Sequence, residues 1–309
     1  MKISSLSRLY LSVLCLSLAG CAKENEPPED RTFRFNGTIN IDGISRSYLL
    51  NLPPDYYESD QFSLVIAMHG GGGHAEQFEA SSGLTGKANS AKFIVVYPDG
   101  VPGPLKIQTW NAGGCCGFAM ETKIDDIKFI SQLIDKLVAE YKINPKKIYA
   151  TGHSNGGMMS YRLACELSGK IAAIAPNSST MVVSAPCNPS RPVPVLHMHS
   201  EKDTNVPYKG GYGTGISNSY SPPLDSVLNV WSMIDACGNP AQTITQSSGY
   251  TFKKWSGCLN NTSINYYLTT DGGHAWPGGS PGSLMGDTPS KSINANDLLW
   301  DFFQQYQLP

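Results

Sequence analysis

Residues 152–156 read Gly-His-Ser-Asn-Gly, which places a serine two positions from a glycine on each side. A β-rich run ending at Thr151 precedes this pentapeptide, and residues 158–167 have the composition of a helix. In a G-x-S-x-G elbow the turn lifts the serine hydroxyl clear of the sheet, and a Cβ at either glycine would clash where strand and helix converge. An ordinary glycine-rich turn with an N-cap serine is the alternative. The flanking strand and helix favour Ser154 as a nucleophile.

A serine hydroxyl becomes a good nucleophile when a base takes its proton and a third group orients that base. After Ser154, the remaining histidines are His197, His199 and His274. His197 and His199 lie two residues apart in an expected strand, so they share one face, and we interpret them as sheet residues or supports of the site. His274 lies between glycines just after the last expected strand. A surface-loop histidine is the alternative, but the chain order Ser, acid, His predicts His274 as the general base.

The acid is expected to follow the strand that comes before the last expected strand, and the last strand leads into the loop of His274. The stretch Ser-Glu-Lys-Asp at residues 200–203 follows the expected strand that ends at Met198. We predict Asp203 as the acid and keep Glu201 in reserve, although an exposed turn aspartate would look the same. Asp271 is too near His274 along the chain to orient it, and we expect it to close the turn.

An acyl-transfer intermediate carries an oxyanion that needs backbone N–H donors. One donor is expected from Asn155, the residue after the nucleophile, and the other from Gly71 or Gly72 in the His-Gly-Gly-Gly-Gly stretch at residues 69–73. A phosphate-binding loop is the competing interpretation of these glycines. It fails because no Gly-Lys-Ser/Thr follows and no dinucleotide-type glycine spacing is present.

The elements that must position these residues alternate between strand and helix. Expected strands cover residues 33–41, 47–52, 62–68, 93–97, 148–151, 171–175, 194–198 and 264–268, and expected helices cover 75–91, 125–141, 158–167, 224–236 and 294–306. Such alternation predicts an α/β fold with a mostly parallel central sheet and helices on both faces. Sites in such sheets lie beyond the carboxyl ends of the strands, which is where the candidate residues gather.

Length, composition and charge limit which classes of protein this chain can belong to. The length beyond residue 32 suits one larger α/β domain, and we predict a single catalytic domain over residues 33–309. Removing Lys2 and Arg8 from the 23 basic side chains leaves 21 against 25 acidic ones, a net charge of −4. No basic stretch stands out, so we expect no nucleic-acid partner. We expect a monomer.

The first 21 residues are expected to be an export signal rather than part of the fold. Leu9–Ala19 is an apolar run too short to span a bilayer, and it leads into Leu-Ala-Gly-Cys at residues 18–21, which resembles the lipobox of bacterial lipoproteins. In that class the cysteine, here Cys21, carries the lipid. A plain secretory signal cleaved near Gly20 is the alternative. Residues 22–32 are polar and proline-bearing and predict a tether.

Six cysteines remain after Cys15 and Cys21, an even number that favours disulfides in an exported chain. No spacing typical of a metal site supports the alternative of a bound metal. Cys237 and Cys258 bracket one local segment and are the best predicted pair. Adjacent cysteines rarely bond to each other, so we expect Cys115 and Cys116 to reach elsewhere, with Cys165 and Cys187 as candidates, although six cysteines allow fifteen pairings.

Six blocks of sequence carry a family resemblance over about His69 to Gly279. They are HGGGG, YPDG, TWNAGGCCG, TGHSNGGMMSYRLACE, RPVPVLHMHSEKD with VPY, and GGHAWPGG. The chain resembles the polyhydroxybutyrate depolymerase and feruloyl esterase group of carbohydrate esterase family 1, which has the α/β-hydrolase fold. The resemblance implies the same three roles for Ser154, Asp203 and His274, no cofactor and no metal, and it offers Trp110 and Trp276 as walls of the substrate pocket.

The resemblance predicts a secreted or membrane-anchored serine esterase. Depolymerases of that group usually carry linker and substrate-binding domains after the catalytic one, whereas this chain ends at Pro309. We therefore expect small or oligosaccharide esters: feruloyl or acetyl esters of plant polysaccharide fragments, or short hydroxyalkanoate oligomers. We expect contact with a membrane only through the lipid anchor. A serine peptidase on the same fold and a non-catalytic glycan-binding envelope lipoprotein are the alternatives.

Overall fold

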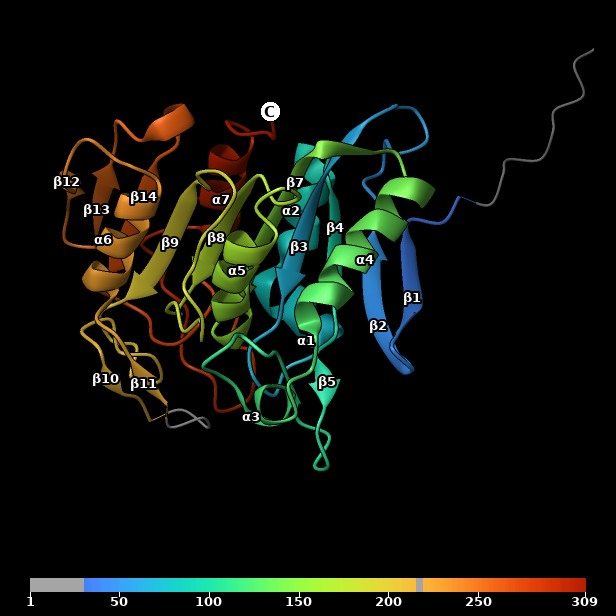
Figure 1. Cartoon of the computed structure of the whole chain (residues 1–309), viewed down its shortest axis with the longest axis horizontal. Helices are drawn as coiled ribbons and strands as arrows, with labels where there is room; N and C mark the ends of the chain where they lie inside the picture. Colours follow the sequence, from blue (N-terminus) through green and yellow to red (C-terminus); the bar gives the residue numbers. More distant parts are fainter. Residues whose placement is uncertain (1–30, 215–218) are drawn as a thin grey trace, which may run out of the picture. The chain divides into compact units, whose positions relative to one another are not determined.

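A ten-stranded sheet forms the centre of a computed structural model of the chain (Figure 1). The structure describes residues 31–214 and 219–309, and residues 33–309 constitute one compact unit. The predicted signal peptide, Cys21 and most of the predicted tether lie outside the described residues. Within the two described ranges, no helix is long and apolar enough to cross a membrane.

The strands of the large sheet are ordered β1-β2-β4-β3-β7-β8-β9-β14-β13-β12. Neighbours from β4 to β14 run parallel, and both edges are antiparallel. The bounds are β1 Arg34–Ile41, β2 Ile44–Asn51, β3 Phe62–Met68, β4 Ile94–Pro98, β7 Ile143–His153, β8 Ala173–Asn177, β9 Val195–Ser200, β12 Gln242–Gln246, β13 Tyr250–Trp255 and β14 Ile264–Thr269. Two small ladders pair β5 (Val101–Pro102) with β6 (Gln108–Thr109), and β10 (Gly211–Tyr212) with β11 (Tyr220–Ser221).

Helices cover both faces of the sheet. They are α1 Ala75–Ser82, α2 Leu84–Ala91, α3 Gly117–Glu121, α4 Asp126–Glu140, α5 Asn155–Glu166, α6 Leu224–Ile234 and α7 Ala295–Phe303, with a short 3-10 turn η1 at Leu259–Asn261. The helices α4, α5 and α6 share one apolar cluster with the strands, and α1, α2 and α7 share the other (Figure 1). The predicted mostly parallel sheet with helices on both faces is confirmed.

The central strands are apolar along their length because both of their faces are covered. In β3, Leu64 and Ile66 belong to the cluster of α4, α5 and α6, whereas Val65 and Ala67 belong to the opposite cluster. Successive side chains of a strand point to opposite faces, so a strand buried on both sides has no polar alternation. This arrangement brings the carboxyl ends of β3, β7, β9 and β14 to one edge, the edge where α3, β5 and β10 lie in Figure 1.

Two elements differ most from the prediction. The helix expected over residues 75–91 is broken into α1 and α2 at Gly83, whose φ of 63° is left-handed and caps α1. The strand that leads to the elbow begins at Ile143 rather than near Ile148, and it includes Asn144 and Pro145 because β3 pairs with Ile143 before its register shifts.

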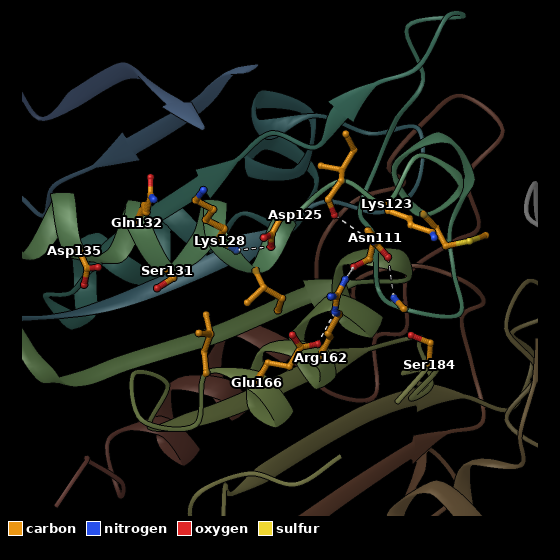
Figure 2. Close-up of a pocket in the computed structure, with 15 residues that line it drawn as sticks. Asn111, Lys123, Asp125, Lys128, Ser131, Gln132, Asp135, Arg162, Glu166 and Ser184 are labelled. Atoms are coloured by element: carbon orange, nitrogen blue, oxygen red, sulfur yellow. Dashed lines mark hydrogen bonds and ion pairs between the residues drawn. The ribbon is translucent and has the colours of Figure 1, made fainter. Parts of the chain in front are cut away.

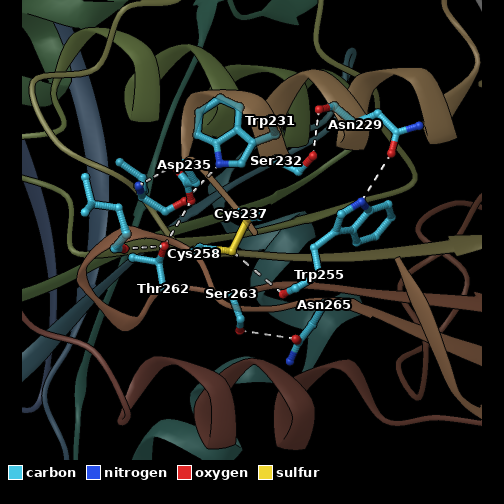
Figure 3. Close-up of a disulfide and its surroundings, with 12 residues drawn as sticks. Asn229, Trp231, Ser232, Asp235, Cys237, Trp255, Cys258, Thr262, Ser263 and Asn265 are labelled. Atoms are coloured by element: carbon cyan, nitrogen blue, oxygen red, sulfur yellow. Dashed lines mark hydrogen bonds between the residues drawn. A yellow bond between two sulfur atoms is a disulfide. The ribbon is translucent and has the colours of Figure 1, made fainter. Parts of the chain in front are cut away.

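Three disulfides join the six cysteines in pairs, and one prediction about them is wrong. Cys237 bonds Cys258 as predicted (Figure 3). Cys165, at the end of α5, bonds Cys187. The adjacent Cys115 and Cys116 therefore bond to each other and not to this pair. Both lie buried against Met158, in a tight loop closed by a hydrogen bond from the Ala112 N–H to the Cys115 carbonyl.

A buried carboxyl lies beside the Cys237–Cys258 disulfide. Figure 3 shows the Asp235 side chain between Trp231 and Thr262. Its oxygens accept from the Val193 N–H at 3.0 Å and from the Thr262 hydroxyl at 3.4 Å. Burial, which these hydrogen bonds only partly offset, raises the pKa of Asp235 to about 7.

Candidate active site

The backbone at Ser154 has the strained geometry of an elbow. β7 ends at His153, α5 begins at Asn155, and Ser154 between them has φ 55° and ψ −120°. A Cβ on Gly152 would lie 2.4 Å from the Gly156 carbonyl carbon, and one on Gly156 would lie 2.2 Å from the Met68 carbonyl oxygen. The two glycines are therefore required for β3, β7 and α5 to converge, and the convergence exposes the Ser154 side chain in part.

The predicted base and acid are in direct contact. His274 Nδ1 lies 2.8 Å from Asp203 Oδ2, although the two residues are 71 positions apart in the chain. Asp203 follows β9, and its Oδ1 accepts from the N–H groups of Asn205 and Val206, both at 2.9 Å. The carboxylate is thus fixed by its own turn, and its second oxygen faces the imidazole. Because a carboxylate only accepts, the Nδ1 of His274 carries the proton and Nε2 is left as the basic nitrogen.

Asp203 is ionised in spite of its burial. Burial alone would raise the pKa of this side chain, which is fully enclosed. Hydrogen bonds from the imidazoles of His199 and His274 outweigh burial and hold the pKa of Asp203 well below its usual range. Glu201, the reserve candidate, is exposed to solvent. Asp271 closes its own loop as expected, since its carboxylate accepts from the Ser290 hydroxyl and the Lys291 N–H.

Asn177 joins the elbow to the base loop. Its carbonyl accepts from the Ser154 N–H at 2.9 Å, and its side-chain amide donates to the Ala275 carbonyl at 3.1 Å. The ring of His153 lies 4.6 Å from the ring of His274, centroid to centroid. Among the hydrogen bonds of residues 31–214 and 219–309, none links the Ser154 hydroxyl to His274. In enzymes without substrate, the hydrogen bond between nucleophile and base is often long, and it shortens when substrate binds.

The glycine loop after β3 is fixed by the buried His69. Its Nε2 accepts from the Gly100 N–H at 2.9 Å, so Nδ1 carries the proton and donates to the Gly70 carbonyl at 2.7 Å. Burial lowers the pKa of His69 to about 4, so the ring remains neutral. Of the two glycines predicted as alternative oxyanion donors, Gly72 donates its N–H to the Gln108 carbonyl at 2.8 Å, which leaves Gly71 as the candidate. In the described part of the chain, the N–H groups of Gly71 and Asn155 donate to no protein acceptor.

The side chain of Asn155 ties the elbow to the loop after β6. Its Oδ1 accepts from the Trp110 N–H at 2.7 Å, and its Nδ2 donates to the Trp110 carbonyl at 3.0 Å. Trp110 in turn donates its indole N–H to the His69 carbonyl at 3.0 Å. Asn155, Trp110 and His69 therefore hold the two predicted oxyanion loops together.

Both tryptophans predicted as pocket walls are core residues, so that prediction is wrong. Trp110 is 0% exposed and packs between His69 and Phe129. Trp276 is 2% exposed, packs against Phe78, and donates to Asn296. A side chain without access to solvent cannot form a wall that substrate touches.

A groove of about 990 Å³ lies away from these residues, between α4, α5 and the loop that begins at Asn111 (Figure 2). Its walls contain neither the elbow serine nor the predicted acid and base. Arg162, the central cation in Figure 2, donates to the Asn111 carbonyl and to Glu166. Through these hydrogen bonds Arg162 holds the loop that contains Trp110 and Asn111 against α5.

The two histidines interpreted from the sequence as sheet residues or supports of the site lie beside the predicted acid. His199 Nε2 lies 3.3 Å from Asp203 Oδ2, the same oxygen that His274 contacts, and His197 contacts His199. The signal was their spacing on the strand before the acid, which placed both on one face but did not reveal contact with Asp203. His69 and Asn177 were also not predicted, because their roles depend on partners far away in the chain.

The chain is similar in sequence to known esterases. A family model described as phospholipase/carboxylesterase matches residues 58–216. Feruloyl esterase B of Piromyces equi is 29% identical over 85% of this chain and 46% of its own length. The bifunctional acetylxylan esterase/xylanase XynS20E of Neocallimastix patriciarum is 34% identical over 79% of this chain and 31% of its own length. The chain thus spans less than half of each of these two relatives.

Shorter relatives align over most of both chains. Feruloyl esterase C of Emericella nidulans is 27% identical over 87% of this chain and 86% of its own length. Among solved structures, the acetyl xylan esterase from Aspergillus awamori superposes with a TM-score of 0.62 at 14% identity, covering 88% of this chain and 98% of the other. At that identity the superposition establishes the fold alone.

Proposed function

Because this chain belongs to the phospholipase/carboxylesterase family, we propose that it is a serine esterase in which Ser154 is the nucleophile, His274 the general base and Asp203 the orienting acid. Family membership makes it a carboxylic ester hydrolase. The observation that carries the assignment of roles is the 2.8 Å hydrogen bond between His274 and Asp203 beside the elbow. It fixes the imidazole tautomer that leaves Nε2 free to accept a proton.

The proposed reaction has two stages. The Ser154 oxygen attacks the ester carbonyl carbon while its proton moves to His274 Nε2, and the N–H groups of Asn155 and Gly71 donate to the oxyanion. The carbon–oxygen bond to the leaving alcohol then breaks, and the alcohol departs with the proton from His274. Water, deprotonated by His274, then attacks the acyl carbon. The bond from that carbon to the Ser154 oxygen breaks, and Ser154 takes the proton back from His274 as the acid is released.

The proposed substrates are feruloyl or acetyl esters of plant cell-wall saccharides. The support is the names of the relatives, which include feruloyl esterases and acetylxylan esterases. Hydroxybutyrate oligomers are the competing substrate class. A panel of methyl ferulate, acetylated xylan oligosaccharides and hydroxybutyrate oligomers, compared by kcat/KM, separates them. A preference for the hydroxybutyrate oligomers would overturn the assignment to cell-wall esters.

The Ser154→Ala variant tests the reaction itself. Hydrolysis of p-nitrophenyl acetate should fall to the background rate, while the circular dichroism spectrum and the melting temperature stay close to those of the unmodified protein. Ser160→Ala is a matched control, since Ser160 lies buried in α5, the helix that follows the elbow, and its hydroxyl donates to the Gly156 carbonyl. Ester hydrolysis at the normal rate by Ser154→Ala would refute the mechanism.

We also propose export and anchoring through a lipid on Cys21. The support is the lipobox-like sequence at residues 18–21 and the three disulfides, which suit an oxidising compartment. A Cys21→Ser variant should move from the membrane fraction to the soluble fraction and lose incorporation of labelled palmitate. Equal membrane retention in the variant would exclude the anchor.

A further inference from the structure

A chain of hydrogen bonds runs through the protein interior and ends at the proposed acid. The Tyr161 hydroxyl lies 2.8 Å from His197 Nδ1, and His197 Nε2 lies 3.1 Å from His199 Nδ1. His199 Nε2 lies 2.7 Å from the Val206 carbonyl oxygen and 3.3 Å from Asp203 Oδ2. Tyr161, His197 and His199 are each at most 1% exposed.

When both imidazoles are neutral, the acceptors at the end of these hydrogen bonds determine where every proton lies. A carbonyl and a carboxylate only accept, so His199 Nε2 carries a proton. In the neutral ring His199 Nδ1 is then an acceptor, and His197 Nε2 must donate to it. His197 Nδ1 is therefore an acceptor too, and the Tyr161 hydroxyl donates to it. With both rings neutral, this assignment satisfies the Tyr161 hydroxyl and all four ring nitrogens of His197 and His199.

The surroundings of His197 keep its imidazole neutral. Burial, followed by the nearby His199, lowers the pKa of His197 well below its usual range. The ring of Tyr266 from β14 packs against His197 with centroids 5.9 Å apart. The other titratable groups around His199 and Asp203 are His274 from the base loop and His153 from the elbow.

We propose that His199 is a positioning residue for Asp203, and that Tyr161 and His197 impose the tautomer in which His199 donates to it. The proposal rests on the proposed roles of Asp203 and His274. Asp203 Oδ2 forms a hydrogen bond with His274 at 2.8 Å and lies 3.3 Å from His199 Nε2, whose N–H also donates to the Val206 carbonyl at 2.7 Å. Only His274 moves a proton during the reaction. His199 fixes the carboxylate oxygen that His274 must meet.

The loss of kcat on substitution should become smaller with distance from Asp203 along these hydrogen bonds. His199→Leu removes the donor, and kcat should drop on the order of tenfold with KM unchanged, the usual cost of removing a group that orients a reacting one. His199→Gln carries an amide N–H near the position of Nε2 and should recover most of kcat. His197→Phe should lower kcat less than His199→Leu does, and Tyr161→Phe should lower it least. Each of these two variants removes only a hydrogen bond that selects a tautomer, and the Tyr161 bond lies further from Asp203 than the His197 bond.

The pH profile separates positioning from a purely structural role. Without the His199 donor, the Asp203 carboxylate becomes more basic and stabilises the protonated form of His274. The acid limb of kcat/KM in His199→Leu should therefore move to higher pH, by roughly half a pH unit. A variant that only loosens packing would lower kcat and leave this limb in place.

The closing experiment measures the tautomers directly in the full chain with 15N-labelled histidine. The chain has six histidines, and single variants assign their signals. At neutral pH, His199 should have a protonated Nε2 and an unprotonated Nδ1, and His197→Phe should weaken that preference. A His199 that is protonated on Nδ1 or charged would overturn the proposal, as would His199→Leu with normal kcat and acid limb. Should Ser154→Ala keep its activity, the proposed function fails while the tautomer result stands, so the two failures are distinguishable.

Discussion

The Nδ1 atom of His274 lies 2.8 Å from Oδ2 of Asp203, and the His274 side chain is 11% exposed while that of Asp203 is fully enclosed. Solvent therefore reaches the base but not the acid. This asymmetry suits a base that must exchange protons with substrate and an acid that only orients it.

Replacing Asp203 by Asn should lower kcat by about 10³- to 10⁴-fold with little change in KM, because an amide can present its NH₂ group to His274 and favour the wrong tautomer. Steady-state kinetics with p-nitrophenyl acetate measure the loss. Glu201→Gln, on the exposed residue of the same turn, is the control and should be unaffected. Comparable losses in both variants would point to the turn rather than to the carboxylate.

Gly156→Ala should destabilise the protein by about 3 kcal/mol or more, because its Cβ would lie 2.2 Å from the Met68 carbonyl oxygen and would force β3 and α5 apart. Urea unfolding followed by circular dichroism measures the change. Gly86→Ala is the control: nothing lies within 4 Å of its Cβ, and it should be neutral or gain up to about 1 kcal/mol from helix propensity. An equally stable Gly156→Ala protein would contradict the packing at the elbow.

Asp126→Asn should cost about 3–5 kcal/mol, because it leaves the Arg46 guanidinium buried without its counter-charge. The two side chains are 2.7 Å apart and at most 3% exposed, and Asp126 also accepts from the Asn111 N–H. The exposed pair of Lys136 and Glu140 offers the comparison, and Lys136→Met should cost at most about 0.5 kcal/mol. Similar costs at both sites would argue against a buried ion pair.

The stability of the protein should contain a component that falls as the pH rises from about 4 to about 7. Burial raises the pKa of Asp235 from 3.8 to about 7, so the folded protein binds this proton more tightly than the unfolded chain. The contribution is greatest below pH 3.8 and is lost as the pH rises through the folded pKa. Asp235→Asn, which mimics the protonated form, should remove this component in urea titrations at several pH values; Asp225→Asn, on the exposed start of α6, should not. An unchanged pH dependence in Asp235→Asn would refute it.

The sheet and the chain order of the site were predictable because both follow local rules. Alternating apolar runs and helical stripes located β3, α4 and β9 to within a few residues, and the elbow motif is marked by glycines that sterics demand. The antiparallel edge of β12 and β13 was not predicted. Its residues are mostly exposed or half-buried, so no buried run marked it.

The failed predictions concern contacts that sequence spacing cannot encode. Trp276 lies two residues after His274 and Trp110 belongs to a block that carries the family resemblance, but both rings are buried in the core. Residue type could not distinguish Gly71 from Gly72 as the oxyanion donor, because the hydrogen bond from the Gly72 N–H to the Gln108 carbonyl of β6 depends on the fold. The Cys115–Cys116 bond follows from the pairing of Cys165 with Cys187, which depends on the path of the chain after β8.

The central claim is that Ser154 is a nucleophile activated by His274, and covalent labelling tests it most directly. A fluorophosphonate probe should modify the protein once, and peptide mass spectrometry should locate the adduct on Ser154. Labelling should slow strongly in a folded His274→Ala variant and disappear in Ser154→Ala. An adduct on another residue, or labelling at the normal rate without His274, would contradict the account.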